Sequence, residues 1–225
     1  MLLLSGYLFI CGTCVGSFIT CMAERTCAAR PLLNRQRSVC PTCLRQLRWW
    51  QLLPLIGVLI QRGRCWDCHH PINLRSSYVE LLCGTLALTS FPQPNLALLC
   101  GYAVLFFNSL TDTLQFTVYP ITLLPPALLG LMGGFPFPDM PLVILGGLLL
   151  GLFLLARYSA KFGMGDVDVL LMLSCLAPPV TVITSLTLAA FAALVTFSLD
   201  RRSARRLPFV PFMTWGFVLC TQFGN

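Results

Sequence analysis

The strongest constraint on this sequence is a series of apolar stretches long enough to cross a membrane. The first, LLLSGYLFICGTCVGSFITCMA, is apolar for about 20 residues, which is the length of a bilayer-spanning helix. Only 10% of the 225 residues are charged, whereas soluble domains carry about 25%. Seven further stretches lie near 77–92, 95–111, 118–134, 140–157, 166–177, 179–199 and 207–222. Because backbone amides in lipid must be satisfied internally and no alternating barrel pattern is present, we predict an all-α polytopic bundle of about eight helices, with six or seven left open.

The basic residues indicate one orientation in the membrane. The chain has 15 lysines and arginines and a net charge of +7, and with eight helices all of them fall on the same side. The positive-inside rule makes that side the cytoplasm and places both termini outside. Topology therefore accounts for the charge. We expect membrane lipid and no nucleic acid among the partners.

Residues 25–76 differ from the rest of the chain. They hold nine of the fifteen basic residues and form a cytoplasmic insert between the first two predicted helices. Within the insert, WWQLLPLIGVLI is apolar but short and contains Pro54. This segment either packs on the insert or lies at the membrane interface, where tryptophan is favoured. The sequence thus predicts three parts: a first helix at 1–24, the insert at 25–76 and a helical core at 77–225.

Two C-x2-C pairs in the insert predict a structural zinc site. The four cysteines are Cys40, Cys43, Cys65 and Cys68. Each pair can direct two sulfur atoms at one ion, and four thiolates complete the tetrahedral shell of Zn²⁺. Four arginines flank the site and offset its net charge of −2: Arg37, Arg45, Arg62 and Arg64. Because so small an insert has little core of its own, metal binding would supply much of its folding free energy.

Two other uses of these cysteines are less favoured. Disulfide pairing conflicts with a reducing cytoplasm. Cys65-x-x-Cys68-His69 also matches the attachment pattern of c-type haem, but haem is normally attached outside the cytoplasm. We interpret His69 and His70 as exposed loop residues, and we assign no role to the cysteines in the apolar helices.

Four of the eight acidic residues lie at or inside predicted membrane helices: Glu80, Asp112, Asp166 and Asp168. An ionisable group at such a position is costly and is a functional candidate by default. Asp112 ends the third predicted helix and Asp166 begins the sixth. Two helices lie between them, so the chain returns to the same face. We therefore expect both carboxylates at the cytoplasmic boundary of the membrane.

A pair of carboxyl groups at this boundary is suited to aspartic peptide hydrolysis. Two adjacent carboxyl groups cannot both ionise easily, so one keeps its proton. The ionised partner can activate a water molecule while the protonated one polarises a scissile carbonyl. The alternative for Asp166 is a purely structural role as a helix cap.

The stretch KFGMGDVDVL places two glycines directly before Asp166. Gly163 and Gly165 allow another backbone to approach closely, so a substrate strand could lie beside Asp166. Asp168 is two residues further along and points to nearly the opposite side of the helix. We interpret it as making an internal polar contact, such as one with Lys161, and not as the second catalytic acid.

Taken together, the motifs resemble those of type IV prepilin peptidases, in particular the short Gram-positive members that serve competence pseudopili. Gly16-Ser17-Phe18 with Arg25 is similar to the family's G-S-F-x-N-V-x-x-x-R, and the two C-x2-C pairs match its cytoplasmic insert. RGRCWDCHHPINLRSSYVELL is similar to the segment that follows in the family and includes Tyr78 and Glu80. LPFVPFMTWG is similar to its proline-rich final segment. The resemblance covers nearly the full length.

The resemblance also implies a set of site residues. Asp112 stands where the family has its first catalytic aspartate, and Gly163, Gly165 and Asp166 match the G-x-G-D motif of the second. For Glu80 it implies a role in the active-site region. The alternative for Glu80 is an interfacial pairing with Arg75.

The activity implied by the resemblance is cleavage of prepilin or pseudopilin leader peptides, in a bacterial plasma membrane at its cytoplasmic face. In many members the new amino terminus is then N-methylated with S-adenosylmethionine. Thr20 and Cys21 replace the family's Asn and Val, so methylation is left open here.

Two functions of other classes also remain open at the level of sequence. One is an ion-coupled transporter that uses Asp112 and Asp166. Such a protein would be expected to show inverted repeats or paired broken helices, and the sequence shows neither. The other is a non-enzymatic pilus or secretion assembly factor. Loss of substrate processing on replacing either aspartate distinguishes the peptidase from both.

Overall fold

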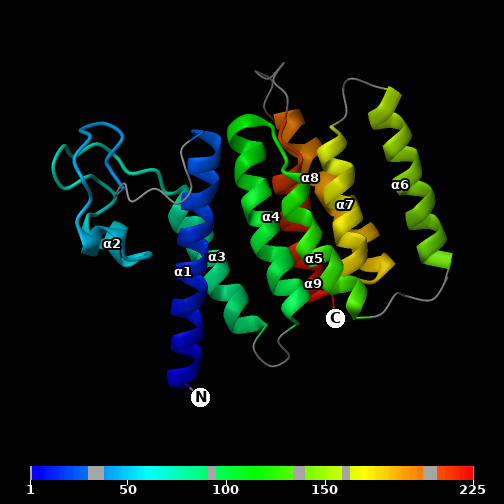
Figure 1. The fold of residues 1–225 in the computed structure, drawn as a ribbon, viewed down its shortest axis with the longest axis horizontal. Coiled ribbons are helices and arrows are strands. Elements are labelled where there is room, and N and C mark those ends of the chain that lie inside the picture. The colour runs from blue at the N-terminus through cyan, green and yellow to red at the C-terminus, as the bar shows by residue number, and fades with distance from the viewer. Residues whose placement is uncertain are drawn as a thin grey trace. The chain divides into compact units, whose positions relative to one another are not determined.

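The computed structural model describes residues 2–29, 38–90, 95–133, 140–158, 163–199 and 207–224. Within these ranges every regular element is a helix (Figure 1), which confirms the all-α prediction. The long helices are α1 (Leu2–Cys27), α3 (Arg75–Thr89), α4 (Leu96–Gln115), α5 (Pro120–Met132), α6 (Met140–Tyr158), α7 (Met164–Leu176), α8 (Pro179–Leu199) and α9 (Val210–Phe223). Two short elements lie in the insert: η1 (Trp49–Leu52) and α2 (Ile56–Ile60).

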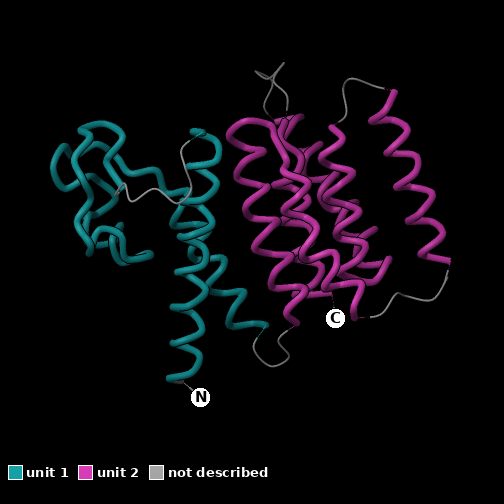
Figure 2. Tube along the Cα trace, in the orientation of Figure 1, with its two compact units in different colours: residues 1–94 teal, residues 95–225 magenta. Residues whose placement is uncertain are grey.

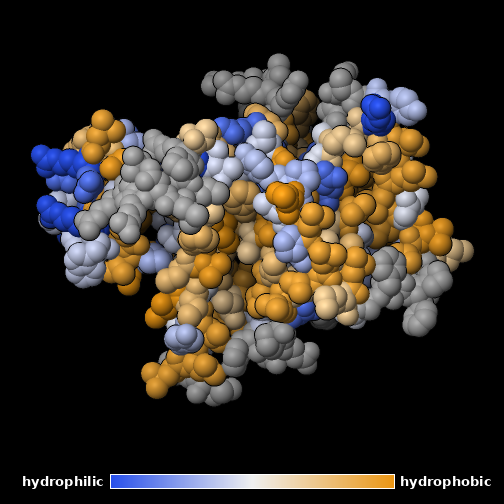
Figure 3. All heavy atoms as spheres, viewed as in Figure 1, coloured by the Kyte–Doolittle hydropathy of each residue, from blue (hydrophilic) through white to orange (hydrophobic). Residues whose placement is uncertain are grey.

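Each of the eight apolar stretches of the sequence forms one of the long helices. Among the described helices, four are long and apolar enough to cross a membrane: Leu3–Cys27, Leu96–Gln115, Met140–Tyr158 and Pro179–Leu199. Helices α5 and α9 are apolar but shorter. Figure 3 shows apolar residues over much of the visible surface of residues 95–225. The predicted membrane bundle is therefore confirmed, because such a surface suits lipid and not water.

The chain divides into two compact units, which Figure 2 shows in different colours. Unit 1 contains residues 1–94, with α1, the insert and α3, and unit 2 contains residues 95–225, with α4 to α9. These units are defined by packing. The three-part division inferred from composition stays a prediction.

In unit 1, α1 and α3 pack closely in opposite directions. A Cβ atom added at Gly16 would lie 2.8 Å from the Cα of Glu80, and one added at Gly84 would lie 2.8 Å from the side chains of Phe9 and Thr13. Small residues allow two helix backbones to approach, and van der Waals packing then stabilises the pair in lipid. Of this pair, α1 is long and apolar enough to cross a membrane.

In unit 2, helices α4, α5, α7 and α9 enclose the core. Its innermost side chains include Leu105, Val169, Leu170, Met213 and Phe217, all at most 1% exposed. Helix α6 lies at the edge of the unit (Figure 1). Helix α7 ends at Leu176 and α8 begins at Pro179. Pro178 cannot continue α7 without losing a backbone hydrogen bond, so the chain turns at this point.

Candidate functional site

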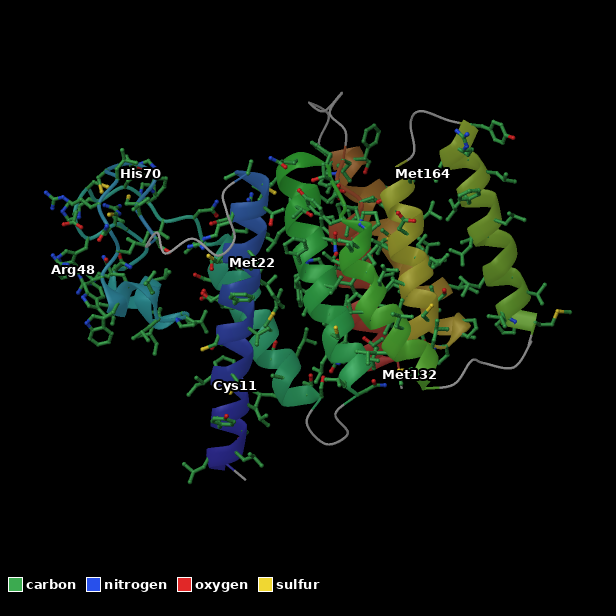
Figure 4. All side chains as sticks on the ribbon, in the orientation of Figure 1. Cys11, Met22, Arg48, His70, Met132 and Met164 are labelled. Carbon is green, nitrogen blue, oxygen red and sulfur yellow. The ribbon has the colours of Figure 1, made fainter. Side chains whose placement is uncertain are left out.

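Asp112 and Asp166 lie at the same end of unit 2. Asp112 is in the last turn of α4 and Asp166 is in the first turn of α7. Figure 4 labels Met164 at the start of α7 and Met132 at the end of α5, and the two lie at opposite ends of the unit. The start of α5, and with it the end of α4, is therefore at the Met164 end. The charge of Asp112 acts on Asp166, so the two carboxyl groups are close enough to interact.

Asp112 is held at the start of α9. Its side chain is buried, and its Oδ2 accepts a 3.1 Å hydrogen bond from the amide of Val210, the first residue of α9. The first amides of a helix lack intrahelical partners and carry the positive end of the helix dipole. Asp112 satisfies one of these amides, that of Val210, and thereby ties α4 to a residue 98 positions later in the chain.

Asp166 lies over the glycine that precedes its helix. The amide of Asp166 donates to the carbonyl oxygen of Gly163 at 3.2 Å. A Cβ atom added at Gly163 would lie 3.4 Å from Oδ2 of Asp166. The carboxyl group therefore folds back toward the Gly163 backbone at the entrance of α7.

The second glycine of the motif has a packing role. A Cβ atom added at Gly165 would lie 2.7 Å from the Cβ of Val118, which belongs to the connection between α4 and α5. No side chain fits there without a shift of this connection. The nearest atoms at the two glycines thus come from Asp166 and Val118. The predicted approach of a substrate strand stays a prediction.

A buried polar network supports Asp112, and sequence reasoning missed it. Asn108 is fully buried one turn before Asp112; its Oδ1 accepts from the amide of Tyr119 at 2.9 Å, and its Nδ2 donates to Oγ1 of Thr122 at 2.9 Å. Thr111 donates to the carbonyl oxygen of Thr117 at 2.8 Å. The network fixes the connection that follows Asp112. The available signal was an amide side chain inside an otherwise apolar helix.

Asp168 follows Asp166 by two residues and is half-buried in α7. Its predicted partner, Lys161, lies outside the described residues. The internal contact proposed for Asp168 therefore stays a prediction.

The four cysteines of the insert form a compact cluster that can hold a metal ion. Their sulfur atoms all lie within 4.8 Å of one another, and those of Cys40 and Cys68 are 3.9 Å apart. A tetrahedral zinc with bonds of about 2.3 Å sets neighbouring sulfur atoms about 3.8 Å apart. The donor set and its spacing therefore fit the predicted ion. None of these cysteines is in a disulfide.

The two halves of the cluster are copies of one local turn. In the first, the backbone amide of Cys40 donates to the carbonyl oxygen of Arg45 at 3.0 Å, and the amide of Leu44 donates to the carbonyl oxygen of Cys40 at 2.9 Å. In the second, 25 positions later, the amide of Cys65 donates to the carbonyl oxygen of His70 at 2.8 Å, and the amide of His69 donates to the carbonyl oxygen of Cys65 at 2.9 Å. Leu44 and His69 both have a positive φ, of 58° and 56°. Each turn is therefore built by its own short sequence.

Charge and hydrogen bonds prepare the cluster for a cation. Hydrogen bonds from the backbone amides of Cys43 and Thr42 lower the pKa of the Cys40 thiol, whereas burial and the neighbouring sulfur atoms raise that of Cys68. Arg45 and Asp67 form a 2.8 Å ion pair that links the two turns. Of the other flanking arginines, Arg62 and Arg64 are exposed and Arg37 lies outside the described residues. His69 and His70 are exposed, as predicted.

Glu80 connects α3 to the insert. Its side chain is buried; Oε2 accepts a 2.8 Å hydrogen bond from the amide of Leu55, and Oε1 accepts one of 2.9 Å from the hydroxyl of Ser76. Among the described residues no ion pair joins Glu80 to Arg75. The role in the active-site region implied by the resemblance stays a proposal.

Comparison with known proteins gives one consistent result. A family model described as the bacterial peptidase A24 N-terminal domain matches residues 10–93. The prepilin leader peptidase/N-methyltransferase of Burkholderia pseudomallei (strain 1026b) is 31% identical over 226 residues, covering 90% of this chain and 72% of that protein. Proteins of the same name from Myxococcus xanthus and Bacillus subtilis match at 41% over 80 residues (36% of this chain, 24% of that protein) and at 31% over 103 residues (46% and 41%). No solved structure matches the chain.

Proposed function

The chain belongs to the prepilin leader peptidase/N-methyltransferase family, and from this premise we propose that it cleaves prepilin leader peptides by an aspartic mechanism. Asp112 and Asp166 are the proposed catalytic pair. The observation that carries the proposal is that these acids, far apart in sequence, lie at one end of unit 2 within electrostatic reach of each other. Membership of a peptidase family also favours an enzyme over the transporter and the assembly factor.

In the proposed reaction the two carboxyl groups share one proton. The ionised carboxylate takes a proton from a water molecule while the oxygen of that water attacks the scissile carbonyl carbon. The protonated carboxyl group donates its proton to the carbonyl oxygen. When the tetrahedral intermediate collapses, the C–N bond breaks and the amine leaves with a proton from the pair. The hydrogen bond from the amide of Val210 favours negative charge on Asp112. We therefore assign Asp112 as the base and Asp166 as the proton carrier.

We propose that this end of unit 2 faces the cytoplasm. Arg157 lies in the last turn of α6, just before the connection to α7. The sequence between α6 and α7 and between α8 and α9 contains five more basic residues: Lys161, Arg201, Arg202, Arg205 and Arg206. Such an excess of positive charge is typical of cytoplasmic loops. A leader peptide with basic residues would meet the carboxylates on this side.

We propose that the cysteine cluster holds a structural zinc ion. All four ligands come from the chain, so no coordination position is left for a substrate. Bound zinc would join the two cysteine turns and thereby order the insert. Elemental analysis of the purified protein should find one zinc per chain. Zinc-free protein with reduced cysteines and an ordered insert would refute this assignment.

N-methylation is named for the relatives, but the residues of this chain give it weaker support. Thr20, which replaces the asparagine of the family motif, is 2% exposed and its hydroxyl donates to the carbonyl oxygen of Gly16 at 2.9 Å. Its polar atom is thus used inside α1 and does not fit a contact with S-adenosylmethionine. We derive no step through this cofactor. A mass spectrum of the processed pilin terminus would detect a methyl group directly.

The peptidase proposal is tested by co-expression with a prepilin-like substrate. Asp112→Asn and Asp166→Asn should each abolish leader removal, because each removes one of the two titrating groups. Asp168→Asn is the matched control, since it makes the same change in the same helix and should leave processing intact. Normal processing by either of the first two variants would overturn the mechanism, and loss with Asp168→Asn alone would show that the wrong acid was assigned.

A further inference from the structure

The insert carries an apolar surface that no other described part of unit 1 covers. It is formed by residues 49–60, and we call it the 49–60 surface. Its exposed side chains are Trp49, Leu52, Leu53, Ile56, Leu59 and Ile60. Trp49 is 76% exposed and Leu59 is 74% exposed. Figure 3 shows apolar residues on this part of unit 1, where α2 lies in Figure 1.

The inner side of the same segment is polar. Gln51 and Gln61 are buried, and Nε2 of Gln51 donates to Oε1 of Gln61 at 3.0 Å. Gln51 also accepts from the amide of Arg48 at 2.7 Å, and Gln61 donates to the carbonyl oxygen of Gly57 at 3.0 Å. A water-exposed element buries its apolar side chains and exposes its amides. This segment does the reverse, which is the arrangement expected for an element whose outer side faces lipid.

The segment is also held at a defined depth along a membrane helix pair. The amide of Leu55, at its centre, is bonded to Glu80 of α3. At the start of α3, Arg75 is close enough to Glu24 for their charges to interact, and Glu24 is followed by Arg25 near the end of α1. These three charged residues lie near the same end of the helix pair, and we take their position as the edge of its apolar part. Glu80 is five residues further into α3 than Arg75, or roughly 7–8 Å along the helix axis at 1.5 Å per residue.

That depth matches the position of interfacial elements, whose apolar sides enter the bilayer to about 5–10 Å. The charges around the segment suit the same place. Arg48 precedes it and Arg62 and Arg64 follow it, and all three are exposed. Figure 4 shows Arg48 on the side of the insert where α2 lies, away from His70. Basic residues beside an apolar interfacial segment are attracted to anionic headgroups.

We propose that the 49–60 surface inserts into the headgroup and upper acyl region of the membrane that α1 and α3 span, and that Arg48, Arg62 and Arg64 bind anionic phospholipid there. Insertion would fix the insert against the bilayer and set the height of the zinc-binding turns above it. This inference depends on the packing of unit 1 and does not depend on the catalytic assignment.

The full chain in lipid nanodiscs provides the test, with Trp49 as the reporter. One variant keeps Trp49 and replaces the other three tryptophans with phenylalanine: Trp50, Trp66 and Trp215. A matched variant keeps only Trp66, which is 51% exposed in the second cysteine turn and whose ring packs edge-on against that of Trp50, with centroids 5.5 Å apart. With acyl-brominated phosphatidylcholine and phosphatidylglycerol, Trp49 fluorescence should fall about twofold or more relative to unbrominated lipid. Trp66 lies behind Trp50 and is not part of the 49–60 surface, so its fluorescence should fall less than that of Trp49.

Two further variants separate lipid contact from other causes. Leu59→Glu in the Trp49 reporter should remove most of the quenching, because a carboxylate resists transfer into the acyl region. Leu44→Glu is its control, since Leu44 is 73% exposed but lies in the first cysteine turn. Omitting phosphatidylglycerol should weaken the quenching. The metal content of each variant shows whether the insert is still folded.

Three results would overturn the proposal. Quenching of Trp49 no greater than that of Trp66 would show that the surface faces water. A blue-shifted Trp49 emission without quenching would show that protein, either unit 2 or a substrate, covers the surface. Quenching unchanged by Leu59→Glu would place Trp49 in lipid for a reason other than the 49–60 surface.

Discussion

The cysteine cluster and the aspartate pair are assembled over very different distances in the sequence. Each half of the cysteine cluster is a six-residue turn closed by its own backbone hydrogen bonds, and the second half repeats the first. Asp112, by contrast, is bound to the start of a helix 98 residues later, and Asn108 holds the connection that follows Asp112 in the chain. A local site can form as soon as its ligand is present. The long-range site exists only when all of unit 2 is folded.

This difference predicts that damage to the two sites should have different consequences. Loss of the metal should affect the insert and leave unit 2 intact, because no residue of unit 2 is among the ligands. Loss of an aspartate should remove chemistry without unfolding either unit. Changes in the network beneath Asp112 should lie between the two, with effects on both stability and rate.

The largest effect is expected from the aspartate pair itself. Asp112→Asn or Asp166→Asn should lower the cleavage rate by roughly 10²–10⁴-fold, the usual contribution of acid–base groups. The double variant should be no slower than the slower single variant, because groups that act as one unit are not additive. Single-turnover cleavage of a prepilin in detergent measures all three. If the rate loss of the double variant equals the product of the two single losses, the acids act independently, and the shared-proton mechanism is wrong.

A change of metal ligand should have the next largest effect, confined to unit 1. Cys65→Ser should reduce bound zinc from the proposed one per chain to near zero, and the insert should become sensitive to protease because metal binding is expected to supply much of its folding free energy. Cys175→Ser, in α7 of unit 2, is the control and should retain zinc. Elemental analysis and limited proteolysis provide the readouts. Equal protection of the insert with and without metal would contradict the local character of this site.

An intermediate effect is expected when Asn108 is replaced. Asn108→Ala leaves the buried amide of Tyr119 and the hydroxyl of Thr122 without this partner, and each lost partner costs about 1–3 kcal/mol. Asn108 holds the connection directly after Asp112, so if this connection positions the acid, kcat should fall while KM changes little. Thr113→Ala is a matched control, since Thr113 bonds only within α4. A pure loss of stability at unchanged kcat would show that Asn108 does not position the acid.

Sequence reasoning predicted what depends on local pattern. The eight long helices follow from the eight apolar stretches, four of which form helices of membrane-spanning length, and the cysteine cluster follows from spacing within two turns. The topological count of helices also placed Asp112 and Asp166 at one end. None of these steps needs the packing of one helix against another.

The features that sequence reasoning missed all depend on packing. Asn108 is one polar residue in an apolar helix, and nothing in the sequence shows that Tyr119 and Thr122 will be its partners. The amide that holds Asp112 belongs to Val210, whose side chain carries no signal for such a contact. The insert also differs from a simple hydrophobic pattern, because Gln51 and Gln61 face inward while the apolar side chains of 49–60 face outward.

The smallest effect predicted here concerns the glycine motif, where packing and catalysis can be separated. Gly165→Ala places a Cβ atom 2.7 Å from the Cβ of Val118, and such overpacking costs about 1–3 kcal/mol. Gly163→Ala meets only Oδ2 of Asp166, at 3.4 Å, so it should lower the thermal stability of unit 2 less. Adding Val118→Gly should restore part of the stability lost by Gly165→Ala, because it removes the opposing atom. Thermal inactivation in detergent measures this series. If Val118→Gly gives no recovery, the need for glycine at 165 comes from the substrate side of Asp166, and the close approach of the connection to α7 is not its reason.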